Sequence, residues 1–169
     1  EFNWPFHHRA SGFMPCDFST EILSDGTAVC HLSEHDPIDR MKGMVSIFLR
    51  PGEKRFETAM RLFNRTDVPH SFLWWENAAV PVHEKYRIFF PEDVRYVNFH
   101  YLKSRTTYPI AGNGIYNGIP MEEPRDISWH KNTVAATSYF ASESAYDFFG
   151  GYDYARECGV VHIGDHHVS

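Results

Sequence analysis

The sequence has little positive charge and no long apolar run, and each lack excludes a class of protein. Lysine and arginine number 16 against 22 aspartates and glutamates, which gives a formal net charge of −6. A general nucleic-acid binder needs clustered cations to neutralise phosphates, so we expect no nucleic-acid partner. No run approaches the roughly 18 apolar residues of a membrane-spanning helix, and no signal peptide is visible, so we expect no membrane partner.

Cysteine is also scarce, with three residues in the whole chain. Cys16, Cys30 and Cys158 do not make a disulfide framework, and none lies in the Cys-x-x-Cys spacing of a zinc or redox site. We therefore expect reduced, buried thiols. This usage suits the cytoplasm, whereas a role on glycans would suit the periplasm, so the sequence leaves the compartment open.

Histidine is abundant, at eleven residues, but it does not occur in metal-binding patterns. Neither His-x-His nor His-Glu-x-x-His, the spacings that place two imidazoles on one face of a strand or helix, is present. The tandem pairs His7-His8 and His166-His167 project to opposite faces of an extended chain. We therefore expect no cofactor, and a bound metal ion is the less favoured alternative.

Helical periodicity is missing as well, whereas strand signals recur along the chain. Two apolar runs, residues 44–50 and 55–64, flank Pro51-Gly52 and predict a hairpin. This spacing of short runs predicts an all-β chain that folds as one antiparallel β-sandwich domain over residues 1–169. Further strands are expected at residues 71–80, 86–90, 95–101, 138–141, 146–149 and 159–163.

Two features concern how the chain is organised. Residues 102–135 are rich in glycine and proline and predict a long loop, and long loops on a rigid β scaffold tend to carry function. The chain begins without an initiator methionine, in what reads as the middle of a domain. We therefore expect a fragment of a larger sandwich that is incomplete at both ends.

Aromatic residues are plentiful, with 14 Phe, 9 Tyr and 4 Trp. Flat aromatic faces stack against the C–H patches of sugars, and nearby polar groups bind the hydroxyls. The alternative is a purely structural role, in which these rings form the core, as aromatic residues usually do in β proteins. Rings, histidines and charged residues gather in four segments, at residues 4–9, 74–77, 126–132 and 148–167.

Acid–base chemistry on a sugar needs two carboxylates, or a carboxylate with a histidine. Glu76 and Asp165 are the candidate catalytic carboxylates, and His8 is their proton-transfer partner. Strand alternation places Trp74 and Glu76 on one face, opposite Trp75. Arg9 and Lys131 are candidates for binding a substrate carboxylate or sugar hydroxyls. The complete set of candidate substrate-binding residues is Arg9, Trp74, Trp75, Trp129, Lys131, Tyr152, Asp153 and His166.

Several of these segments together resemble a known family. The chain is similar to a bacterial domain of unknown function, often followed by tetratricopeptide repeats, in the galactose-mutarotase-like superfamily. The resemblance implies an antiparallel β-supersandwich with a concave sugar-binding face, and a tetratricopeptide-repeat region or missing flanking chain as partner. Trp74-Trp75-Glu76 stands where mutarotases carry a catalytic histidine, which argues against aldose epimerisation. The segments that carry the resemblance are residues 6–15, 33–37, 72–77, 126–132, 148–153 and 164–167.

Three functional hypotheses follow from these residues. The leading one is a carbohydrate-active domain that resembles a glycoside hydrolase and binds a sugar on a concave sheet face. The second is a non-catalytic carbohydrate-binding module, whose affinity depends on tryptophans and not on Glu76 or Asp165. The third is a structural or interaction sandwich whose aromatic residues are core and whose exposed edges pair with another chain.

Overall fold

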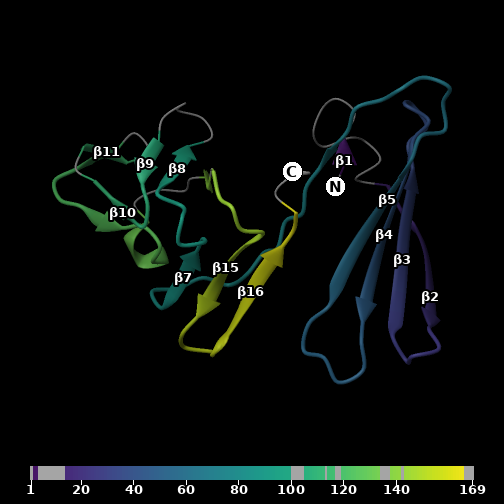
Figure 1. The fold of residues 1–169 in the computed structure, drawn as a ribbon, viewed down its shortest axis with the longest axis horizontal. Coiled ribbons are helices and arrows are strands. Elements are labelled where there is room, and N and C mark those ends of the chain that lie inside the picture. The colour runs from purple at the N-terminus through teal and green to yellow at the C-terminus, as the bar shows by residue number, and fades with distance from the viewer. Residues whose placement is uncertain are drawn as a thin grey trace. The chain divides into compact units, whose positions relative to one another are not determined.

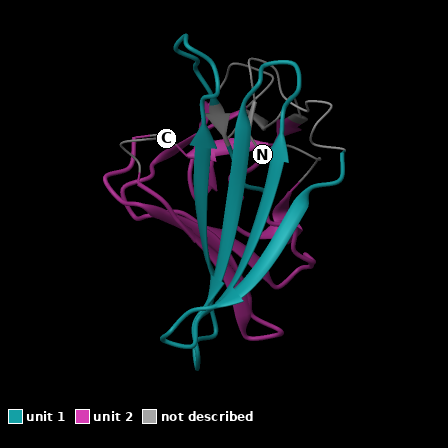
Figure 2. Cartoon of the chain, turned by 90° about the vertical axis from the view of Figure 1, so that its right-hand side faces the viewer, with its two compact units in different colours: residues 1–77 teal, residues 78–169 magenta. Residues whose placement is uncertain are grey.

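The computed structural model describes residues 2–3, 14–99, 105–112, 114–116, 119–133, 138–141 and 143–165. This part of the chain is all-β, as predicted, and its strands pair antiparallel (Figure 1). It divides into two compact units, residues 1–77 and residues 78–169, drawn in teal and magenta in Figure 2. No helix in these described ranges is long and apolar enough to cross a membrane.

The first unit contains a four-stranded meander in the order β2-β3-β4-β5, visible as four long arrows in Figure 1. A separate pair of two-residue strands joins β1 to β6. Consecutive strands are neighbours because short turns connect them, which is the simplest antiparallel topology. The bounds are β1 Phe2–Asn3, β2 Asp17–Ile22, β3 Ala28–His35, β4 Lys42–Leu49, β5 Glu57–Phe63 and β6 Leu73–Trp74.

The predicted hairpin is confirmed as β4 and β5. Its turn holds Gly52 at φ 77°, a left-handed conformation that glycine adopts without a steric penalty. In this hairpin Ile47 of β4 pairs with Thr58 of β5. Strands β2 and β3 were not predicted, because three consecutive polar residues, 19–21 in β2 and 33–35 in β3, break the alternation of a half-buried strand.

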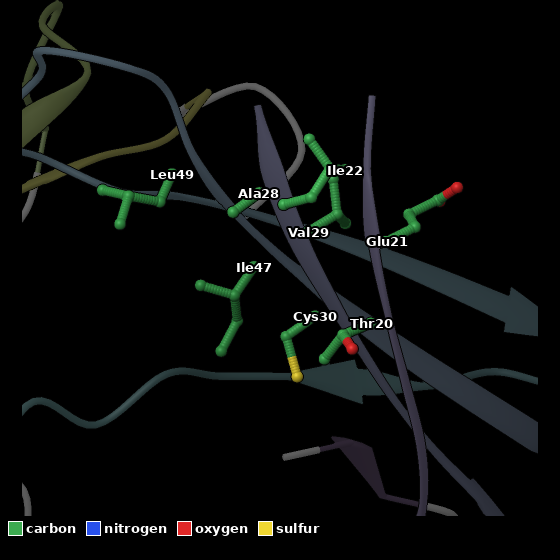
Figure 3. Close-up of a pocket in the computed structure, with 8 residues that line it drawn as sticks. All are labelled: Thr20, Glu21, Ile22, Ala28, Val29, Cys30, Ile47 and Leu49. Carbon is green, nitrogen blue, oxygen red and sulfur yellow. The ribbon is translucent and has the colours of Figure 1, made fainter. Parts of the chain in front are cut away.

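One face of the meander is largely apolar. Residues that pair across β2, β3 and β4 share a face, and here they enclose a shallow hollow of about 440 Å³ (Figure 3). Ile22 is 70% exposed on this face, so its side chain covers little of the hollow. The residues of this face that line it are Thr20, Ile22, Ala28, Cys30, Ile47 and Leu49.

The second unit contains two three-stranded sheets, ordered β16-β15-β7 and β14-β8-β9. Two short pairs, β10 with β13 and β11 with β12, lie between β9 and β14 in sequence. The bounds are β7 Tyr86–Phe89, β8 Tyr96–Phe99, β9 Arg105–Thr107, β10 Ile110–Ala111, β11 Gly114–Tyr116, β12 Ile119–Met121, β13 Arg125–Asp126, β14 Tyr139–Ala141, β15 Phe148–Asp153 and β16 Cys158–Ile163.

The core of this unit is small and lies around β8 and its neighbours. Val97 and Ala111 are fully buried, and the ring of Phe90 packs edge-on against Tyr108 at 5.0 Å between centroids. The hydroxyl of Tyr108 donates a hydrogen bond of 2.8 Å to the carbonyl of Ile88, which ties this core to β7. The buried cluster is Val94, Val97, Phe99, Tyr108, Ala111, Met121 and Ile127.

Several sequence expectations are wrong in detail. Residues 102–135 are not one long loop, because short strands and the 3-10 turn η2 (His130–Asn132) form between the glycines and prolines. The strand expected at 71–80 ends at Trp74, so alternation cannot place Glu76 on the face of Trp74. The thiols of Cys16 and Cys158 are exposed and not buried.

The strand expected at 146–149 is displaced, and two glycines explain why. Strand β15 runs from Phe148 to Asp153, straight through Gly150 and Gly151. A Cβ at Gly151 would collide with the ring of Tyr86, and one at Gly150 would lie 2.8 Å from the ring of Phe89. Glycine is therefore required here so that the rings of β7 can cross the neighbouring strand.

Candidate functional site

A row of side chains crosses the β15-β7 sheet and reaches the segment before η2. Tyr152 on β15 pairs with Arg87 on β7, and Arg87 forms an isolated antiparallel bridge with Trp129. Residues directly opposite one another in neighbouring strands project to the same face. Gly159 of β16 pairs with Tyr152 from the other side, and a Cβ there would lie 3.0 Å from the Tyr152 ring.

Trp129 lies at the centre of this row, among two cations and a second ring. The Arg87 guanidinium carbon lies 5.3 Å from the Trp129 ring centroid, and the Lys131 ammonium lies 5.7 Å from it. Both distances suit cation–π attraction. The Tyr154 ring lies 5.4 Å from Trp129, and it meets Tyr152 edge-on at 4.9 Å. We call these five residues, Arg87, Trp129, Lys131, Tyr152 and Tyr154, the Trp129 cluster.

Hydrogen bonds fix the segment that presents Trp129. Arg87 Nε donates to Ser128 Oγ at 3.0 Å, and the fully buried Ser128 hydroxyl donates in turn to Asp126. The Asn132 side-chain amide donates to the Asp126 carbonyl at 2.8 Å, and the Ile88 N–H donates to the Ser128 carbonyl at 2.8 Å. Trp129 is therefore presented by a segment that is hydrogen-bonded on both sides.

The two cations of the Trp129 cluster lack acidic partners. Across the described ranges, no carboxylate oxygen lies within 4.0 Å of the nitrogens of Arg87 or Lys131. Lys131 is exposed, and Arg87 is half-buried. Since Nε is the only Arg87 nitrogen with a hydrogen bond in this part of the chain, its two terminal nitrogens have donors to offer a ligand.

Asp153, at the end of β15, holds the turn beside the cluster. Its side chain is 5% exposed and contacts His83 Nε2 at 2.9 Å. It also accepts the N–H groups of Ala155 and Arg156, at 2.9 and 3.0 Å. Burial alone would raise the pKa of Asp153, but the hydrogen bonds from His83 and from the two backbone N–H groups lower it below 3.8.

The tautomer of His83 follows from its second partner. The N–H of Lys85 donates to His83 Nδ1 at 3.2 Å, so this nitrogen is unprotonated and Nε2 carries the hydrogen that faces Asp153. On the same face of the sheet, Tyr86 is buried opposite Asp153. Burial, followed by the negative charges of Asp153 and Cys158, raises the pKa of Tyr86.

Three of the predicted binding residues come together in the Trp129 cluster. They are Trp129, Lys131 and Tyr152, and Asp153 follows directly along β15. His8, Arg9 and His166, as well as the side chain of Trp74, lie outside the described residues.

The two predicted catalytic carboxylates belong to different units. Glu76 is exposed in the first unit, where its Oε1 accepts a hydrogen bond of 2.7 Å from the Thr58 hydroxyl. The neighbouring Trp75 is half-buried. Asp165 is exposed in the second unit, two residues after the end of β16. Their catalytic roles stay predictions.

Sequence reasoning missed Arg87, Tyr154 and His83. Arg87 lies in an apolar strand that reads as core, and its partners Ser128 and Trp129 are about forty residues further along the chain. Tyr154 follows directly after the predicted pair Tyr152-Asp153, which was the one available signal. Pairing between strands this far apart in sequence is not visible in a local pattern.

The first unit holds a second polar group, on the face of the meander opposite the hollow. His31 Nδ1 lies 2.8 Å from Ser46 Oγ, and His31 Nε2 lies 2.9 Å from Glu21 Oε1. This order of groups is that of an activated serine. However, Ser46 is only 4% exposed in the middle of β4, so its hydroxyl offers little access to a substrate. The bonds tie β2, β3 and β4 together.

Side chains that could hold a metal ion do not gather in the described ranges, where no three His, Cys, Asp or Glu residues lie close enough together to bind one.

The chain belongs to a family described as a domain of unknown function, DUF5107, whose match covers residues 1–169. No solved structure matches this one. The resemblance to a domain of unknown function is thereby confirmed.

Proposed function

We propose that this chain is a carbohydrate-binding domain and that the Trp129 cluster is its sugar-binding site. The observation that carries the proposal is the grouping of three aromatic rings and two cations on the β15-β7 sheet and the adjoining segment. A sugar ring presents C–H groups to an aromatic face, while its hydroxyls accept hydrogen bonds from the cations at the edge.

Exposure supports a binding role over a purely structural one. Tyr154 is 51% exposed and Lys131 is exposed, although both are held against Trp129. The structural alternative is that Arg87 and Trp129 simply stabilise the segment before η2. That alternative explains the half-buried Arg87, but it gives no reason for two exposed side chains to gather on the same indole.

Rigidity also supports binding. Tyr152 and Arg87 lie on paired strands, and Trp129 is tied to β7 by the hydrogen bonds around Ser128. A site built on regular strands keeps its geometry in the absence of ligand, which reduces the entropy lost on binding.

The proposal extends to the fold and to neighbouring segments. We place the chain in an antiparallel β-sandwich of the galactose-mutarotase-like kind, with a tetratricopeptide-repeat region or further flanking chain as its partner. The support is the set of sequence segments that resemble that superfamily, together with the antiparallel all-β structure.

Hydrolysis of a glycosidic bond is the enzymatic form of the proposal. In it, Glu76 and Asp165 are the two carboxylates, and His8 is the proton-transfer partner. The test is turnover of a glycan that the domain binds, compared between the wild type, Glu76→Gln and Asp165→Asn. Turnover that survives both substitutions would refute these assignments.

The binding proposal is tested by calorimetric titration with a panel of mono- and oligosaccharides. Truncating an interface anchor costs on the order of 1 kcal/mol or more, so Trp129→Ala should weaken affinity at least about fivefold. Tyr154→Ala and Tyr146→Ala form a matched pair, because both tyrosines are about half exposed in the second unit and only Tyr154 contacts Trp129. The site would be refuted if Trp129→Ala, Tyr154→Ala and Tyr146→Ala all bound the sugar with the same affinity.

A further inference from the structure

We infer that the sugar bound at the Trp129 cluster is acidic, and that Arg87 and Lys131 bind its anionic group. The inference rests on the proposed function and names the class of ligand for the same site. The anionic group is an oxyanion, such as the carboxylate of a uronate or the sulfate of a sulfated sugar.

The charge balance of the chain is the first argument. The chain has a formal net charge of −6, so carboxylates outnumber cations, and three other arginines, Arg50, Arg55 and Arg156, lie close to carboxylates. Arg55 contacts Glu53 at 2.7 Å, and Arg156 lies 3.8 Å from Asp153.

Arg61, Arg95 and Arg125 also lack a carboxylate within 4.0 Å in the described residues, so the distinguishing feature of Trp129 is that two cations meet there. Two cations share one indole ring, and neither has a carboxylate within 4.0 Å in the residues that the structure describes. Both cations lie beside one indole ring, so an anionic group bound at this ring is attracted by both of them.

The orientation of Arg87 is the second argument. Its Nε is occupied by Ser128 Oγ, which is buried and itself hydrogen-bonded to Asp126. The guanidinium plane is therefore fixed, and its two terminal nitrogens remain as a fork. Such a fork matches the paired oxygens of a carboxylate or sulfate, whereas a sugar hydroxyl accepts from only one arm.

Lys131 provides a second contact of a different kind. It lies on η2, two residues after Trp129, and its ammonium lies over the same ring as Arg87. An ammonium is a mobile point charge, which attracts an anion without requiring one geometry. Arg87 would therefore set the orientation of the acidic group, and Lys131 would add attraction that depends on ionic strength.

The experiment compares three matched ligands with the full 169-residue chain in a calorimeter. They are a galacturonate trisaccharide, the corresponding neutral galactose trisaccharide, and a sulfated galactose oligosaccharide. Charge-assisted hydrogen bonds are about twice as strong as neutral ones, so an acidic ligand should bind at least about tenfold more tightly than the neutral one. The preference should shrink when NaCl is raised from 50 mM to 500 mM, because the Debye length falls from about 14 Å to about 4 Å.

Variants assign the preference to the two cations. Lys131→Gln should lower affinity for the acidic ligand about tenfold and affinity for the neutral ligand by clearly less, and Arg87→Lys should reduce the preference because it removes the fork. Lys85→Gln is the matched control, since Lys85 is an exposed lysine of the same unit whose hydrogen bonds within the described residues are made by its backbone. Comparing the affinities for the galacturonate and the sulfated ligand then shows which of the two oxyanions the site prefers.

The outcomes separate this inference from the proposed function. Equal binding of neutral and acidic ligands, still weakened by Trp129→Ala, would overturn the inference and leave the sugar site in place. An acidic preference that persists unchanged in Lys131→Gln and Arg87→Lys would also overturn it. Absence of binding by all three ligands would overturn both.

Discussion

The close approach of Tyr86 to Gly151 gives a prediction about how β15 is held. A methyl group at position 151 would collide with the Tyr86 ring, whose Cζ atom would lie 2.7 Å from the new Cβ. Tyr86 is 6% exposed, so its ring cannot move aside into solvent. We therefore expect Gly151→Ala to force the two strands apart or to push the ring out of its rotamer.

The expected cost combines two opposing effects. Overpacking of a buried site costs about 1–3 kcal/mol. Replacing glycine with alanine reduces the conformational entropy of the unfolded chain, which stabilises the folded state by about 0.4–1 kcal/mol. The net loss of stability should therefore be about 1–2 kcal/mol. With a urea dependence of about 2 kcal/mol per M, the unfolding midpoint should fall by about 0.5–1 M.

Gly112 offers a matched control within the same unit. A Cβ at Gly112 would lie 3.9 Å from Thr107 Oγ1, which is ordinary contact distance, and the residue is exposed. Gly112→Ala should therefore leave the midpoint unchanged or raise it slightly. The assay is urea unfolding followed by circular dichroism for the wild type and both variants.

A double-mutant cycle tests the mechanism directly. In a Tyr86→Leu background the ring is gone, so the cost of Gly151→Ala should fall by at least about half. A cost that is the same in both backgrounds would refute the argument from the ring, and so would a Gly151→Ala midpoint equal to that of Gly112→Ala.

Three further predictions concern titration and surface charge. Burial raises the pKa of Tyr108 to about 12, so stability present below the unfolded-state pKa near 10 should be lost as the pH rises toward 12, and Tyr108→Phe should flatten this loss in melting curves. Hydrogen bonds from the Ala145 N–H and the Ser144 hydroxyl lower the pKa of Asp93, so its stabilisation should be complete above pH 3.8 and lost as the pH falls below that value; an unchanged acid profile in Asp93→Asn would contradict this. Arg50→Gln should leave the urea midpoint of unfolding close to that of the wild type, because its ion pair with Glu57 is exposed, and a large fall in that midpoint would contradict this.

The sequence predicted the elements that have a local signature. The hairpin around Pro51-Gly52 was found because a turn signal lies between two apolar runs. Strand β7 was found because Pro91 closes a short aromatic run. Strands β2 and β3 were not found, since one face of each carries polar residues such as His31. A local pattern detects a strand with one exposed face only where apolar and polar residues alternate, and three consecutive polar residues break this alternation in each of the two strands.

The candidate site was predicted in part for a similar reason. Trp129, Lys131 and Tyr152 stand out by residue type, and each was named from the sequence. Their grouping depends on the pairing of β15 with β7 and on the bridge from Arg87, which are contacts between distant segments. Residue type can therefore nominate members of a site, but only the strand register shows which of them meet.

The position of Arg87 connects ligand binding to the exchange of backbone hydrogens. The strand that carries it pairs with β15 on one side, and on the other the Ile88 N–H bonds to the Ser128 carbonyl. A ligand that contacts both Arg87 and Trp129 stabilises the hydrogen bond between Ile88 and Ser128, because breaking that bond would separate the two residues that hold the ligand. The amide proton of Ile88 would then exchange with deuterated water more slowly as ligand occupancy rises. The exchange rate of this single backbone hydrogen would therefore report the fraction of the domain that is bound.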